Sequence, residues 1–257
     1  MLSVKGLIVF ITGASSGIGE ACAHVFAEQG ARLVVCARRM DRLQKLDAEL
    51  RAKYGVELLA LQLDVRSHAK VHETISGLPE NWREIDVIIN NAGLAVGKDK
   101  LHEARVEHWE QMIDTNVKGL LYVTREILPG MVARNRGHVI NIGSIAGHEA
   151  YSGGSVYCAT KSAVRSISRA LQMDVLGSDV RVSSVDPGFT DTEFSLVRFG
   201  YDRTAAEEVY RGMRPLSAAD IADAVLYCAT RPAHVNISEM LILPTDMASA
   251  TQIYRRT

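Results

Sequence analysis

The sequence lacks the features that mark several large classes of protein. Its four cysteines are widely separated, include no C-x-x-C pair and lie among apolar or small residues, so we expect reduced thiols. The formal net charge is -1, and no excess of positive charge points to nucleic acid or an anionic membrane as a partner. No metal site is expected.

Long hydrophobic runs and linkers are also missing. The longest early apolar run, residues 7–11, is too short to span a membrane, and no signal-peptide cleavage pattern follows it. We found no internal repeat and no low-complexity tract. With 257 residues, of which 47% are hydrophobic and 23% charged, residues 1–257 are expected to form one domain with a sizeable core. We expect a soluble cytoplasmic protein.

Short apolar, β-branched runs alternate with helical patterns along the chain. The expected strands are residues 7–12, 32–37, 56–63, 85–89, 137–143, 180–185 and 239–243. The expected helices are residues 20–29, 41–53, 108–132, 154–176 and 218–229. This alternation predicts an α/β fold, a doubly wound parallel sheet of about seven strands with helices on both faces, in the Rossmann-type arrangement.

A glycine-rich turn joins the first expected strand to the first helix, where residues 12–19 read T-G-A-S-S-G-I-G. Glycines allow a tight turn and a close approach to a pyrophosphate, and the N–H groups of the new helix face its charge. An ordinary turn is the open alternative for this motif alone. The expected phosphate-binding residues are Gly13, Ser15, Ser16, Gly17, Ile18 and Gly19.

The second expected strand is followed by Arg38 and Arg39. Proteins that bind NAD carry an acidic residue near this point, which accepts a hydrogen bond from the ribose 2′-hydroxyl. Guanidinium groups instead pair with phosphate and stack on adenine, so this strand end favours NADP. A solvated turn before the next helix is the alternative.

Polar and small residues also follow the third and fourth strands. Asp64, beside Val65, is positioned to accept a hydrogen bond from the adenine amino group, or to cap the next helix. The sequence N-N-A-G at residues 90–93 allows close approach to a ribose, or forms a plain turn. Ligands bind such sheets beyond the carboxyl ends of the strands, where all of these residues are expected. The candidates added here are Asp64, Val65, Asn91, Ala92 and Gly93.

Ser144, Tyr157 and Lys161 form the most informative group. Ser144 lies at an expected strand end, and Lys161 follows Tyr157 by four residues, on the same face of a helix. A nearby cation would lower the pKa of the phenol from about 10, so that Tyr157 can exchange a proton with an alcohol or carbonyl oxygen. Ser144 would donate a second hydrogen bond to that oxygen. By itself, a Y-x-x-x-K pair also arises by chance on amphipathic helices.

Two features interrupt the regular pattern. Asn116 lies inside the expected helix 108–132, where asparagine is mildly unfavourable, and this suggests a bent turn that holds a water. Chance placement is the alternative. Residues 193–216 show little regular pattern and are expected to form a lid or substrate wall. The basic residues at the end of the chain are expected to be solvated.

Together these motifs resemble the short-chain dehydrogenase/reductase family. The matching features are T-G-x-x-x-G-I-G at 12–19, N-N-A-G at 90–93, Asn116, Ser144, Y-x-x-x-K at 157–161 and P-G at 187–188, in family order across essentially the whole chain. The resemblance implies an NADP(H)-dependent oxidoreductase and a homotetramer.

The same resemblance assigns roles to individual residues. It implies that Tyr157 is the general acid/base and that Lys161 lowers the pKa of Tyr157 and binds the nicotinamide ribose. It further implies that Ser144 orients the carbonyl and that Asn116 holds a relay water. The remaining cofactor-binding residues that it implies are Pro187, Gly188, Thr190 and Thr192.

Residues 78–82, 91–97, 192–199 and 232–237 resemble a narrower group, the NADP-dependent 3-hydroxy acid dehydrogenases that oxidise serine and allo-threonine. Relatives of that group include sulfoacetaldehyde and malonic semialdehyde reductases, and clavulanate-type aldehyde reductases are a more distant likeness. The implied substrate is a 3-hydroxy acid or a short anionic aldehyde. A guanidinium fits such an anion, which makes Arg198 the candidate clamp, with an exposed lid arginine as the alternative. The expected substrate-binding residues are Ser144, His148, Tyr151, Ser152, Tyr157 and Arg198.

Two other functions stay open at this point. One is a reductase of a larger neutral ketone or aldehyde. The other is a non-catalytic NADP-sensing binding protein on the same fold, because fold alone does not fix function. Such a sensor has no need of Tyr157 or Lys161, and the presence of both favours an enzyme.

Overall fold

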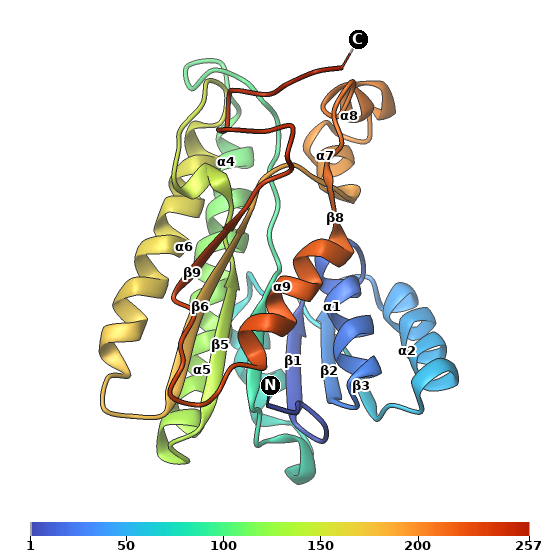
Figure 1. The fold of residues 1–257 in the computed structure, drawn as a ribbon, viewed down its shortest axis with the longest axis vertical. Coiled ribbons are helices and arrows are strands. Elements are labelled where there is room, and N and C mark those ends of the chain that lie inside the picture. Colours follow the sequence, from blue (N-terminus) through green and yellow to red (C-terminus); the bar gives the residue numbers. More distant parts are fainter. Residues whose placement is uncertain (1, 257) are drawn as a thin grey trace.

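The centre of the molecule is a seven-stranded parallel sheet, seen in a computed structural model that describes residues 2–256 (Figure 1). The strand order is β3-β2-β1-β4-β5-β6-β9, which confirms the predicted doubly wound sheet. The strands are β1 (Ile8–Thr12), β2 (Arg32–Ala37), β3 (Leu58–Gln62), β4 (Val87–Asn90), β5 (Gly137–Ile142), β6 (Val180–Pro187) and β9 (Glu239–Ile242). The chain winds outward from β1 in one direction and from β4 in the other. A crevice is therefore expected where β1 and β4 end side by side.

Helices cover both faces of the sheet, and alternate side chains of each strand explain why. In β1, Val9 and Ile11 pack toward α1 (Gly17–Glu28), α2 (Met40–Tyr54) and α9 (Ala218–Ala229). Ile8 and Phe10 point to the other face and pack toward the second layer of helices. That layer contains α3 (His68–Ser76), α5 (Leu120–Ala133) and α6 (Ser155–Asp174), and Figure 1 shows α5 and α6 on the side of the sheet away from α1 and α2.

The helix predicted at residues 108–132 is real and is interrupted where Asn116 indicated. It consists of α4 (Val106–Ile113), a π-helical stretch (Asp114–Gly119) and α5. A π-helical turn carries an extra residue and is frequent at functional sites. Asn116 lies within this stretch and is buried.

The segment 193–216 is more regular than the sequence pattern suggested. It folds into α7 (Glu193–Arg198) and α8 (Arg203–Glu208), and then β8 (Leu216–Ser217) pairs with β7 (Thr190–Asp191). Figure 1 shows α7 and α8 at the same end of the molecule as α4, beyond the strands. Helices of six residues are too short to show a clear periodicity, which is why the sequence did not reveal them.

Arg255 and Arg256, the last basic residues, are exposed as expected, and both also bind neighbouring groups. Arg255 Nη2 donates to the carbonyl of Val209 at 3.2 Å, and Arg256 Nη2 pairs with Asp246 Oδ1 at 2.8 Å. The end of the chain is thus attached beside the segment 193–216.

None of the helices within residues 2–256 combines the length and apolar character that a membrane span requires. The four cysteines, Cys22, Cys36, Cys158 and Cys228, are free and buried, which agrees with the expected thiols. Burial raises the pKa of the Cys22 and Cys36 thiols to about 12.

Candidate active site

A cavity of about 650 Å³ opens beyond the carboxyl ends of the strands and brings most of the predicted site residues together. On the cofactor side its lining includes Gly13, Ser15, Ser16, Gly17, Ile18, Arg38, Arg39, Asp64, Val65, Asn91, Ala92, Gly93, Pro187, Gly188, Thr190 and Thr192. On the substrate side it includes Ser144, Tyr151, Ser152, Tyr157, Lys161 and Arg198. Three predicted residues, Gly19, Asn116 and His148, do not line it.

The glycine-rich turn holds the ends of β1 and β4 together at the cavity floor. Thr12 Oγ1 accepts hydrogen bonds from the N–H groups of Asn91 at 3.0 Å and Ala92 at 2.9 Å. Gly17 has a φ of 59°, a left-handed conformation that favours glycine, and a Cβ there would lie 3.2 Å from Thr192 Cβ. Ser16, the residue at the N-cap of α1, makes no capping hydrogen bond with its side chain. The first N–H groups of the helix are therefore available to an anionic group.

Tyr157 and Lys161 project from α6 into the cavity, and both are buried. Lys161 Nζ donates to the carbonyl of Ile142 at 2.8 Å and lies 6.0 Å from the centre of the Tyr157 ring. Burial lowers the pKa of Lys161 to about 8, while the carboxylate of Asp186 works to raise it.

The pKa of Tyr157 differs from the sequence-based expectation. Burial raises it above the ordinary value of a phenol, and the neighbouring Ser144 hydroxyl and the charge of Arg198 work against this increase. Arg198, which was predicted only to bind the substrate, is therefore one of the two groups that lower the pKa of Tyr157. A tyrosine with a raised pKa stays protonated at neutral pH, so the proton is present, but the hydroxyl is a weaker acid than a free phenol.

Asn116 is held between Leu94 and Thr160 of α6. Its side chain accepts from the N–H of Leu94 at 2.9 Å and donates to the Leu94 carbonyl at 2.8 Å and to Thr160 Oγ1 at 3.0 Å. A Cβ on Gly93 would lie 3.4 Å from Asn116 Oδ1 and 3.6 Å from Lys161 Nζ. The missing side chain at Gly93 therefore allows the amide and the ammonium to approach the same space.

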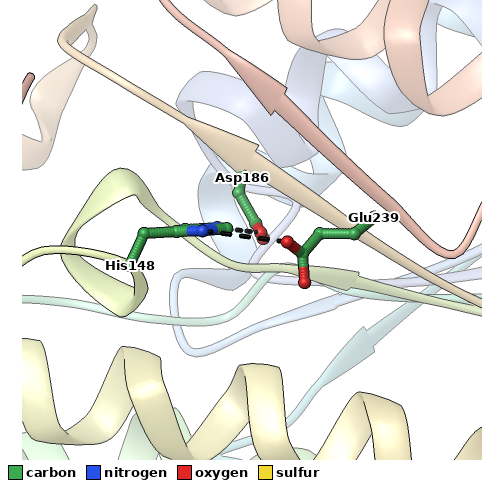
Figure 2. A group of neighbouring side chains, drawn as sticks. All are labelled: His148, Asp186 and Glu239. Atoms are coloured by element: carbon green, nitrogen blue, oxygen red, sulfur yellow. Dashed lines mark hydrogen bonds and ion pairs between the residues drawn. The ribbon is translucent and has the colours of Figure 1, made fainter.

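His148 is placed differently from its predicted role in substrate binding, as Figure 2 shows. Its Nε2 lies 2.7 Å from Asp186 Oδ2, and its Nδ1 lies 3.7 Å from Glu239 Oε1. The short helix after Ser144 (Ile145–Gly147) turns the chain toward β6 and β9, so the imidazole faces these carboxylates and not the cavity. Arg165 Nε also binds Glu239 at 2.9 Å. The carboxylate of Glu239 is thus shared between the Arg165 guanidinium and the His148 imidazole.

Arg198 reaches the substrate side of the cavity from α7. Its Nη1 donates to the Tyr151 hydroxyl at 3.0 Å and its Nε to the Gly97 carbonyl at 3.1 Å. The guanidinium lies 5.5 Å from the centre of the Tyr151 ring and 5.8 Å from that of Tyr157. Arg198 is half-buried at this position. The alternative of an exposed lid arginine is therefore wrong.

Two residues that the sequence reasoning missed, Arg42 of α2 and Glu193 of α7, lie beside the strand end that predicted NADP. Arg39 donates to Ser15 Oγ and Ser16 Oγ, and it forms an ion pair with Glu193. Arg42 binds the same carboxylate. Arg42 lies three residues beyond Arg39, on the first turn of α2, and this helical spacing could have identified it. Glu193 lies far away in sequence and gave no such signal.

Asp64 is also more occupied than expected. Arg66 Nε lies 3.0 Å from Asp64 Oδ1, and Arg66 Nη2 lies 2.6 Å from Oδ2. The hydrogen bonds from Arg66 hold the pKa of this carboxyl below its usual range. Asp64 keeps its place on the cavity wall, but an adenine amino group would share it with Arg66.

Comparisons with known proteins agree with this geometry. The family model described as short chain dehydrogenase matches residues 7–198. The NADP-dependent 3-hydroxy acid dehydrogenase YdfG of Salmonella typhi is 49% identical over 245 residues, which cover 95% of this chain and 97% of the relative. The serine 3-dehydrogenase of Rhizobium radiobacter is 39% identical over 250 residues, 97% of this chain and 98% of the relative. The solved closed form of a serine dehydrogenase complexed with NADP+ has a TM-score of 0.91 and 46% identity, with 98% of this chain and 100% of that chain covered.

Proposed function

The chain belongs to the short-chain dehydrogenase family and is an NADP-dependent oxidoreductase, and on this basis we propose that it interconverts a small 3-hydroxy acid and the corresponding carbonyl acid. The observation that carries the substrate class is the half-buried guanidinium of Arg198, 5.8 Å from the Tyr157 ring in the same cavity. A short substrate offers little apolar area for binding, so a charged contact must supply much of its orientation. Arginine is suited to a carboxylate because it can donate two parallel hydrogen bonds.

The donors around the cavity fit NADP. The N-terminus of α1 suits a pyrophosphate, and the hydroxyls of Ser15 and Ser16 with the guanidinium of Arg39 suit a 2′-phosphate. On the other side, Lys161 and the residues Pro187, Gly188, Thr190 and Thr192 would hold the nicotinamide riboside. When bound, the nicotinamide supplies the hydride donor or acceptor.

The protein side chains move the proton. In reduction, Ser144 donates a hydrogen bond to the carbonyl oxygen, and Tyr157 gives its hydroxyl proton to that oxygen as it becomes an alcohol. In oxidation, Tyr157 must first lose its proton and then take the proton of the alcohol. Because burial raises the pKa of Tyr157, a higher pH favours the oxidation of the alcohol. Lys161, whose Nζ lies 6.0 Å from the centre of the Tyr157 ring, and Asn116 then pass the proton on from Tyr157, a role that the family resemblance implies.

The remaining parts of the proposal concern the whole molecule. The segment 193–216 serves as the lid, since it supplies Arg198 and Phe194 to the cavity. The ring of Phe194 lies 5.5 Å from that of Tyr157. The protein is a cytoplasmic homotetramer that associates through the two long helical segments, α4 with α5 and α6, and through β9. Exposed apolar side chains on these elements support this assembly: Ile113, Leu121, Val132 and Leu241. Light scattering should give the mass of four chains at micromolar concentration, and a monomeric mass would contradict the assembly.

The substrate class is tested with matched pairs of alcohols. One pair is 3-hydroxypropanoate and 1,3-propanediol, which differ in whether a carboxylate stands at the far carbon, and serine extends the series. The reduction of NADP+ is measured by absorbance. We expect kcat/KM to be at least roughly tenfold higher with the acids than with the diol, a difference of about 1.4 kcal/mol in transition-state binding. A preference for the diol would contradict the proposed substrate and would favour neutral carbonyl compounds.

A further inference from the structure

The carboxylate of Glu193 lies in the corner of the cavity that suits the 2′-phosphate. Its Oε2 is 2.9 Å from Arg39 Nη1, and its Oε1 is 2.6 Å from Arg42 Nη1. Burial opposes ionisation of Glu193, but the hydrogen bonds from Arg42 and Arg39 outweigh it and hold the pKa below its usual range. Glu193 is therefore a fixed negative charge next to the serine hydroxyls of the glycine-rich turn.

All three nitrogens of the Arg39 guanidinium already donate to oxygens. Nε donates to Ser15 Oγ at 3.1 Å, Nη2 to Ser15 Oγ at 3.0 Å and to Ser16 Oγ at 2.7 Å, and Nη1 to Glu193. These bonds use four of the five N–H groups, so a phosphate that binds two nitrogens of Arg39 must share at least one occupied donor. The two serines can remain, because a hydroxyl can turn and donate its own proton to a phosphate oxygen. Glu193 can only accept hydrogen bonds and has the same sign of charge as the phosphate, so it must leave.

We propose that Glu193 is a cofactor-selectivity residue whose carboxylate competes with the 2′-phosphate of NADP for Arg39. Arg42 does not line the cavity and binds the other oxygen of Glu193, so the displaced carboxylate keeps one partner outside the cofactor corner. NAD carries a 2′-hydroxyl, which can donate a hydrogen bond to the carboxylate and leaves the Arg39 ion pair in place. Glu193 thus reduces the preference of the protein for the phosphorylated cofactor below what its arginines alone would give.

The side chains in this ion pair are about one-third exposed, at 38% for Arg39 and 36% for Glu193. Exchange is therefore easy, because exposed ion pairs contribute little to stability. A phosphate carries nearly two negative charges and three acceptor oxygens, so it makes the stronger contact with a guanidinium. The phosphate is expected to displace the carboxylate and to lose part of its binding free energy in doing so.

The test compares Glu193→Gln with wild type using two ligands that lack the nicotinamide, 2′,5′-ADP and 5′-ADP. These ligands differ only in the 2′-phosphate, so the ratio of their dissociation constants isolates the contact in question. Titration calorimetry measures both. The control variant is Glu208→Gln, which removes an ion pair with Arg211 in the same segment, and neither of these two residues lines the cavity. Thermal melting of each variant checks that the fold is kept.

We expect Glu193→Gln to bind 2′,5′-ADP roughly three- to tenfold more tightly than wild type, and 5′-ADP within about twofold of wild type. Glu208→Gln should leave both dissociation constants unchanged. Unchanged or weaker binding of 2′,5′-ADP would overturn the proposal, and so would an equal gain for both ligands. The inference rests on the proposed NADP-dependent function. If wild-type protein failed to prefer 2′,5′-ADP over 5′-ADP, that function itself would be contradicted, whatever the variant does.

Discussion

Replacement of Arg198 by methionine examines how the cavity recognises its substrate. In the structure two nitrogens of Arg198 donate to Gly97 and Tyr151, and the remaining N–H groups, with the positive charge, are left for a substrate carboxylate. A hydrogen bond to a charged group contributes about 1.5 to 3 kcal/mol. The variant should therefore lose roughly ten- to hundredfold in kcat/KM for a 3-hydroxy acid.

A second effect of the same substitution must be separated from the first. The charge of Arg198 also works to lower the pKa of Tyr157, so its loss should slow the proton transfer for every substrate. A neutral alcohol of the same length measures this common effect. If Arg198 binds the carboxylate, the fold-loss in kcat/KM should be at least about ten times greater for the acid than for the neutral alcohol. Equal losses would refute it and would leave Arg198 with an effect on Tyr157 alone.

Three further outcomes are expected. Arg38→Ala with Arg39→Ala should weaken NADP roughly ten- to hundredfold and NAD much less, measured as dissociation constants, and a higher wild-type kcat/KM with NAD would show that this strand end was misinterpreted. Lys161→Met should abolish most turnover but raise the free energy of unfolding by up to about 3 kcal/mol, measured by urea titration near pH 7. The reason is that the variant removes a buried ammonium whose pKa is lowered to about 8. A lower free energy of unfolding would contradict this explanation. The rate of oxidation should rise with pH through the neutral range because the raised pKa of Tyr157 keeps the base protonated below it, and a rate that falls over this range would argue against Tyr157 as the base.

The fold was largely predictable because its signals are local. The boundaries of β2 and α9 agree with the expected ones, since an apolar strand that ends at arginines and a helix with its own capping box are complete within a few residues. The interruption at Asn116 was visible for the same reason. The short helices α7 and α8 were missed because six residues give too little periodicity to distinguish a helix from a loop.

The site was predictable only where its residues act through local spacing. Tyr157 and Lys161 lie on the same face of α6 because they are one helical turn apart, and the glycine-rich turn was expected to act through its own backbone N–H groups. Glu193 meets Arg39 across 154 positions of sequence, so nothing near either residue could announce the pair. His148 was assigned to the substrate from its closeness to Ser144, but the short helix between them turns its side chain toward Asp186.

The most direct test of the central claim is Tyr157→Phe, which keeps the ring and removes the proton. Turnover of a 3-hydroxy acid with saturating NADP+ should fall by about 10²- to 10⁴-fold or more, because both the proton transfer and a hydrogen bond to the reacting oxygen are lost. The dissociation constant of NADP should stay within about twofold of wild type, since the hydroxyl contributes little to binding compared with the charged contacts. Near-normal turnover in this variant, with intact cofactor binding, would contradict the assignment of Tyr157 as the acid/base of this enzyme.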